Sequence, residues 1–162
     1  MIEIKEFRGQ KFITKPIRSG FYNVIYELTE QHVVKVNRPD RDATVEDLVQ
    51  ESQVAHQLYN EGVSVPKPEG IFKVKIRWGK NLYGLWFPTK IGFVMEKING
   101  INGDEINGDL RKKVEELHQI ELEKCWKLGF FTGDIDLSNS IYDSVNAKSY
   151  LIDFYGWALA AK

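Results

Sequence analysis

Three polar side chains near the end of the sequence have the types and the spacing that phosphate chemistry uses. Asp134 stands five residues before Asn139, and Asp153 follows fourteen residues later, directly after an apolar run. Functional side chains are commonly held in loops and at strand ends by a rigid scaffold. Magnesium prefers oxygen ligands, often one or two from the protein, with phosphate and water completing the octahedron. Asn139 and Asp153 supply such a pair, which leaves Asp134 to orient or deprotonate an attacking hydroxyl.

These residues carry a resemblance to protein kinases. In that superfamily an Asp of the catalytic loop precedes an Asn by five residues, and a second Asp follows in an Asp-Phe-Gly motif. Gly133-Asp134-Ile135 lacks an Arg before the Asp and looks more like the atypical branches: RIO-type kinases, the small Bud-type kinase of the KEOPS complex, and aminoglycoside phosphotransferases. The resemblance implies a phosphotransferase that uses ATP and Mg2+, with Asp134 as a catalytic residue and Asn139 and Asp153 as metal ligands.

Two upstream residues resemble the kinase pair that holds the phosphates of ATP. Val33-Val34-Lys35-Val36 is similar to the third kinase strand, whose Lys reaches the α- and β-phosphates. Glu51 lies on the inward stripe of the first predicted helix, where the family's Lys-pairing Glu stands, and Asp47, one turn earlier, is the alternative. The resemblance therefore implies that Lys35 and Glu51 belong to the catalytic set.

Further segments resemble the parts that hold the rest of the nucleotide. Met95-Glu96-Lys97-Ile98 is similar to the gatekeeper and hinge, whose backbone hydrogen-bonds adenine. The turn at 18–23 has one glycine where the family's phosphate loop has three, although Ser19 and Gly20 can still offer backbone N–H groups. The resemblance runs from about Ile17 to Gly156. It implies an ATP-binding set made of Ser19, Gly20, Lys35, Met95, Glu96 and Ile98.

The first part of the chain predicts a small antiparallel sheet with one helix. Residues 12–17, 21–28 and 32–36 are rich in Val, Ile, Tyr and Phe and are separated by turn residues, which predicts three consecutive strands. The alternation at 71–78 and the short apolar run at 91–95 add two more. Thr44 with Asp47 predicts the start of a helix, and Gly62 predicts its end. Residues 79–90 are expected to form a hairpin or an inserted loop.

The second part predicts a smaller, mainly helical lobe. A helix is expected from Leu110 to Leu128, followed by a loop and by short strands at 140–143 and 150–152. Three glycines and three asparagines within 99–109 predict a flexible linker and place a lobe boundary there. We therefore expect one α+β kinase-like bilobal domain with ATP in its cleft. Its N-lobe, residues 1–98, is an antiparallel sheet with one helix, and its truncated C-lobe is 99–162.

Departures from the kinase pattern leave the substrate open. Thr132 stands where typical kinases have His, Asp136 where they have Lys, and Tyr155 where they have Gly. The sequence ends six residues after Gly156, so we expect no activation segment and no peptide-docking helices. A C-lobe this short leaves room for completion by a second copy or by another partner.

Composition narrows the classes of protein. A 43% hydrophobic content across 162 residues is enough for a core, and a net charge of −1 argues against a nucleic-acid module driven by bulk charge. The single cysteine, Cys125, excludes an internal disulfide and suits a reducing compartment. No apolar run approaches the roughly 20 residues of a membrane span, and no signal-peptide pattern opens the sequence. We expect a cytoplasmic protein with no membrane partner.

Three functions remain open at this point. The first is an atypical Ser/Thr-type kinase whose acceptor is a protein, a small molecule or the chain itself. The second is an ATP-binding pseudokinase or slow ATPase that switches a partner, and the third is an interaction module that binds no nucleotide.

The histidines His32, His56 and His118 share no metal-ligand spacing and are interpreted as structural. Residues 73–90 are interpreted as an amphipathic hairpin rather than as an RNA-binding surface.

Overall fold

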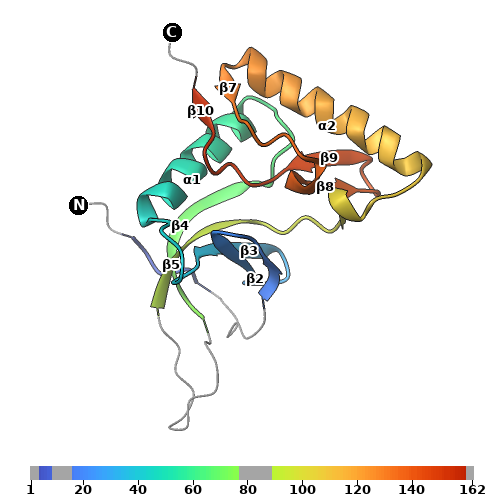
Figure 1. Cartoon of the computed structure of the whole chain (residues 1–162). Helices are drawn as coiled ribbons and strands as arrows, with labels where there is room; N and C mark the ends of the chain where they lie inside the picture. The colour runs from blue at the N-terminus through green and yellow to red at the C-terminus, as the bar shows by residue number, and fades with distance from the viewer. Residues whose placement is uncertain (1–3, 9–15, 77–88, 160–162) are drawn as a thin grey trace. The chain divides into compact units, whose positions relative to one another are not determined.

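The computed structural model describes residues 4–8, 16–76 and 89–159 (Figure 1). The chain divides into two compact units. Unit 1 comprises Met1–Ser52 with Pro68–Lys97, and unit 2 comprises Gln53–Lys67 with Ile98–Lys162. Among the described residues, neither of the two helices has the length and apolar character to cross a bilayer.

Unit 1 is built on a five-stranded antiparallel sheet with the strand order β1-β2-β3-β5-β4. The strands are β1 (Pro16–Ser19), β2 (Asn23–Glu27), β3 (His32–Asn37), β4 (Pro68–Lys75) and β5 (Thr89–Glu96). The predicted antiparallel meander is confirmed for the second and third strands, and β1 overlaps the predicted first strand only at residues 16 and 17. Most of the predicted strand at 12–17 and of the loop at 79–90 lies outside the described residues.

Side-chain alternation along β3 places apolar and charged groups on different faces of the sheet. Val34 and Val36 are buried in a core cluster shared with β2, β4 and β5. Successive residues of a strand point to opposite faces, so Lys35 lies on the face away from that cluster. Its Cα partners on the neighbouring strands are Ile25 and Phe93.

The helix α1 (Val45–Asn60) begins and ends where the sequence predicted. The Asp47 carboxylate accepts from the Thr44 N–H at 2.7 Å, and the Thr44 hydroxyl accepts from the Asp47 N–H at 3.2 Å. This reciprocal pair satisfies donors that the first helical turn leaves unpaired. Gly62 follows the helix with a φ of +79°, the left-handed conformation that suits glycine at a helix C-terminus.

Unit 2 contains one long helix, α2 (Asp109–Lys127), and small sheets. One sheet has the order β6-β8-β9, from β6 (Ile101–Asn102), β8 (Ser140–Asp143) and β9 (Lys148–Leu151), and β7 (Phe130–Phe131) pairs with β10 (Ala158–Leu159). The core around α2 includes Ile106, Val114, Leu137 and Tyr142. The predicted second helix and the hairpin of short strands are confirmed, whereas the two-residue strands were not predicted.

The flexible linker predicted at 99–109 is wrong. This segment contains β6, which pairs with β8, and the 3-10 helix η1 (Gly103–Glu105). Gly103 is buried, and a Cβ there would collide with the carbonyl oxygen and side chain of Leu137. Gly100 lies against the backbone of Tyr142 in the same way. These glycines permit a close approach of two chain segments, and the sequence alone does not distinguish that role from flexibility.

Candidate functional site

In unit 1, the structure brings Lys35 and Glu51 together. The Nζ atom of Lys35 on β3 lies 2.6 Å from Oε1 of Glu51 on α1. The two residues are only 3% and 2% exposed. A buried ion pair is seldom more stabilising than an apolar pair of the same volume, so its presence here is weak evidence for a role in stability. Asp47, the alternative partner, instead caps α1 through Thr44.

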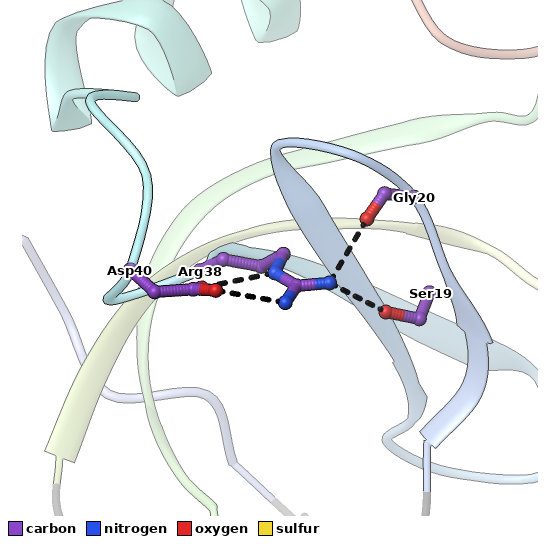
Figure 2. A network of polar contacts seen from close by, with 4 residues as sticks. All are labelled: Ser19, Gly20, Arg38 and Asp40. Carbon is purple, nitrogen blue, oxygen red and sulfur yellow. Dashed lines mark hydrogen bonds and ion pairs between the residues drawn. The ribbon is translucent and has the colours of Figure 1, made fainter.

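Ser19 and Gly20 lie at the end of β1 and in the turn before β2 (Figure 2). The Gly20 N–H donates to the Asn23 carbonyl at 2.8 Å, so this donor is already used inside the turn. The Arg38 guanidinium approaches the Ser19 hydroxyl and the Gly20 carbonyl, each at 3.4 Å. The turn that was predicted to bind phosphate therefore contacts Arg38, the residue that follows β3.

Asp40 holds the Arg38 guanidinium in this place. Its two carboxylate oxygens accept from Nε and Nη2 of Arg38 at 3.0 and 2.9 Å. This hydrogen bonding raises the pKa of Arg38 and lowers the pKa of Asp40, so both groups are charged at neutral pH. Arg41 lies 4.0 Å from the centre of the Phe21 ring in the same turn. Sequence reasoning missed Arg38 and Arg41, although both follow the Lys35 strand closely.

The predicted hinge lies at the end of β5 and the start of unit 2. Met95 is buried and faces Val33 across the ladder, and Glu96 faces His32. Lys97 is fixed by its N–H, which donates to the Gln31 carbonyl at 2.8 Å, and by an ion pair with Glu27. Ile98 is the first residue of its stretch of unit 2.

In unit 2, Asp134 lies in an exposed loop that α2 anchors. The Asp134 N–H donates to the Thr132 hydroxyl at 3.0 Å, and the His118 ring on α2 bonds the Ile135 carbonyl at 3.1 Å. Asp136 caps the 3-10 helix η2 (Leu137–Asn139) by accepting from the Ser138 N–H at 2.7 Å. The Asp136 carboxylate is thus held by a backbone N–H, whereas Asp134 is held through its own N–H and not through its carboxylate.

The two predicted magnesium ligands lie at neighbouring positions of one hairpin. The Ile152 N–H donates to the Asn139 carbonyl at 2.8 Å, and Asp153 is the next residue. Asp153 has a φ of +68°, a conformation that Asp tolerates better than most residues and that often marks functional sites. Phe154 is buried beside Trp157, with ring centres 5.4 Å apart, and fixes the turn that follows.

An amide oxygen and a carboxylate are a fitting donor set for magnesium when phosphate and water supply the other ligands. Asn139 and Asp153 provide these two donors. Within the ranges that the structure describes, no three His, Cys, Asp or Glu side chains gather as a self-sufficient metal site. The donor set therefore fits a nucleotide-bound Mg2+ rather than a metal held by protein groups alone.

Comparison with known proteins identifies the fold. No family model and no curated protein matches the sequence, whereas 258 chains of solved structures match this fold. One is the crystal structure of a Stt7 homologue from Micromonas algae soaked with ATP, with 15% sequence identity and a TM-score of 0.67. The match covers 98% of this chain and 54% of that chain. The chain has an α+β protein-kinase-like fold. The predicted fold class is confirmed, and the closer likeness to the RIO, Bud or aminoglycoside branches stays a prediction.

Proposed function

We propose that this chain is an ATP-dependent phosphotransferase of the kinase type that uses Mg2+. The observation that carries the proposal is the buried ion pair between Lys35 on β3 and Glu51 on α1, within a kinase-like fold. A lysine ammonium fixed by a carboxylate is suited to hold the α- and β-phosphates of ATP. Ser19 and Gly20 cover the phosphates, and Met95, Glu96 and Ile98 hold adenine in this proposal.

Unit 2 supplies the remaining groups. Asn139 and Asp153 hold Mg2+, which neutralises charge on the phosphates when it is bound. Asp134 orients the acceptor hydroxyl and receives its proton. The hydroxyl oxygen bonds to the γ-phosphorus as the bond to the β–γ bridging oxygen breaks, and ADP leaves with that electron pair. Catalysis of this kind depends on positioning and on charge neutralisation.

We propose a Ser or Thr hydroxyl, on another protein or on the chain itself, as the acceptor. The Asp134 carboxylate is exposed, and in the part of the chain that the structure describes it has no hydrogen-bond partner. A carboxylate in that state is available to a hydroxyl from solution. The chain spans about half the length of its structural neighbour, and a second copy or another chain supplies further acceptor contacts in this proposal.

Transfer from γ-labelled ATP tests the function. We expect the wild-type protein with Mg2+ to place label on itself or on an added protein acceptor. Asp134→Ala should keep ATP binding and lose transfer by orders of magnitude, whereas Asp153→Ala should lose the magnesium-dependent part of ATP binding. Asp104→Asn, an exposed change on η1, is the matched control and should behave as wild type. Full activity in both the Asp134 and the Asp153 variants would refute the assigned roles.

One observation favours a second candidate, an ATP-binding switch or slow ATPase. The Gly20 N–H is bonded inside its own turn, so the turn as seen here presents one donor fewer to the phosphates. The same labelling assay separates the candidates. Label on an acceptor supports the kinase, and free phosphate without labelled acceptor supports the switch. ATP that fails to bind at all would leave only an interaction module.

A further inference from the structure

A pocket of about 580 Å³ lies beside the loop that carries Asp134, wholly within unit 2. Its walls are Arg111, Glu115, His118 and Gln119 of α2 on one side and 133–137 on the other. The pocket is open to solvent and its lining is more polar than apolar, which suits a polar group of a ligand better than an enclosed apolar molecule. No role proposed above uses the α2 wall.

The charge in the pocket is negative. Arg111 and Glu115 pair with each other, with 2.8 Å between Nε and Oε1, and so largely cancel. Asp134 and Asp136 remain, and neither has a cationic side-chain partner within hydrogen-bond distance among the described residues. An anionic ligand is therefore disfavoured.

His118 adds a second and independent requirement. The residue is 6% exposed, and its Nε2 is 3.1 Å from the Ile135 carbonyl. A carbonyl oxygen only accepts, so Nε2 carries the hydrogen, and in the neutral ring Nδ1 is an acceptor. Burial lowers the pKa of His118, which favours that neutral ring. Nδ1 is buried and has no hydrogen-bond partner in the described part of the chain, so His118, a residue of the pocket wall, carries an acceptor that lacks a donor.

We infer that this pocket binds a guanidinium or ammonium group of the phosphate acceptor, in the form of an Arg or Lys side chain of a basic peptide. Such a group supplies positive charge to Asp134 and Asp136 and an N–H donor to the His118 side of the pocket. An apolar ligand would remove these polar groups from water without replacing their partners. The role in acceptor choice rests on the proposed function. In that role, the pocket would make this chain a transferase that selects acceptor hydroxyls next to Arg or Lys residues of a peptide.

Peptide binding without ATP tests the pocket separately from transfer. We would measure fluorescence anisotropy of a labelled peptide that contains one Ser and three Arg, and of its counterpart with Gln in place of each Arg. The Arg peptide should bind at least about tenfold more tightly, because it alone brings cations to the pocket. Equal binding of the two peptides, or tighter binding of a Glu-containing counterpart, would overturn the inference.

A matched pair of variants places the effect in the pocket. Asp136→Asn removes the charge but keeps an oxygen that can cap η2, and it should weaken Arg-peptide binding about two- to fivefold, as expected for one exposed ion pair. Glu116→Gln removes an exposed charge of α2 outside the pocket walls and should leave binding unchanged. His118→Phe keeps a ring of similar size but has neither the donor to Ile135 nor the Nδ1 acceptor, and it should also weaken binding. Wild-type affinity in both Asp136→Asn and His118→Phe would refute the assignment.

Two further comparisons separate the possible outcomes. Agmatine, a small guanidinium compound, should displace the Arg peptide only at much higher concentration, and displacement at equal concentration would show that a small amine, not a peptide, is the ligand. If the Arg peptide binds but no label is ever transferred, the proposed function fails and the pocket stands. If label reaches other acceptors and the Arg peptide does not bind, the pocket assignment alone fails.

Discussion

Removing Glu51 is the sharpest perturbation that the structure offers. Glu51→Ala would leave the Lys35 ammonium 3% exposed without the carboxylate 2.6 Å away. Breaking one side of a buried ion pair typically costs about 3–5 kcal/mol, because the remaining charge stays desolvated. With a urea slope of roughly 2 kcal/mol/M, the unfolding midpoint should fall by about 1.5–2.5 M.

Two control variants make this prediction specific. Replacing both partners by apolar residues, Lys35→Met with Glu51→Leu, removes both charges, so the free energy of unfolding should return to within about 1–2 kcal/mol of wild type. Glu46→Ala, an exposed change in the same helix, should cost less than about 1 kcal/mol. The assay is urea unfolding followed by tryptophan fluorescence and by circular dichroism. A loss below about 1 kcal/mol in Glu51→Ala, or a double variant as unstable as the single one, would refute the reasoning.

Three further predictions concern stability and reactivity. Gly103→Ala should destabilise by about 1–3 kcal/mol or more, because its Cβ meets the Leu137 carbonyl, while Gly20→Ala, with its nearest atom at 3.6 Å, should change the urea midpoint little. Burial raises the pKa of Cys125 to about 12, so the native protein should resist alkylation at pH 8 and react only in denaturant, as mass spectrometry would show. Burial lowers the pKa of His118 in the folded state below the ordinary value of 6.5. The unfolded chain therefore binds the proton first, so the stability that His118 contributes is full above about pH 6.5 and is lost as pH falls through the folded pKa. The stability advantage of wild type over His118→Gln should shrink between pH 7.5 and pH 5, and a constant difference in urea midpoint would contradict this.

Much of the fold is predictable from sequence because its signals are local. The Thr44–Asp47 cap and Gly62 set the bounds of α1, and runs rich in β-branched and aromatic residues between turns marked the strands of the large sheet. The pairing of Lys35 with Glu51 was also predictable. Glu51 falls on the same helical stripe as Leu48 and Ala55, both buried, so the helix turns its carboxylate inward.

Other features depend on contacts between distant segments and have no local signal. Gly100 and Gly103 resemble linker glycines in sequence, yet each lies where a second segment passes too close for a Cβ. From the sequence, His118 was interpreted as an ordinary structural histidine. Its hydrogen bond to the Ile135 carbonyl, seventeen residues away in the chain, connects it to the Asp134 loop, and no local pattern predicts this contact. The strands β7 and β10 have two residues each, too few for any periodicity to appear.

ATP-dependent thermal stabilisation, compared between wild type and the Lys35→Met/Glu51→Leu variant, tests the central claim most directly. A ligand that binds only the folded protein raises its melting temperature, so millimolar ATP with Mg2+ should stabilise wild type. The double variant, folded but without the buried ammonium, should show no shift or a much smaller one. An equal shift in both proteins, or none in wild type, would contradict the claim that Lys35 holds the phosphates of ATP.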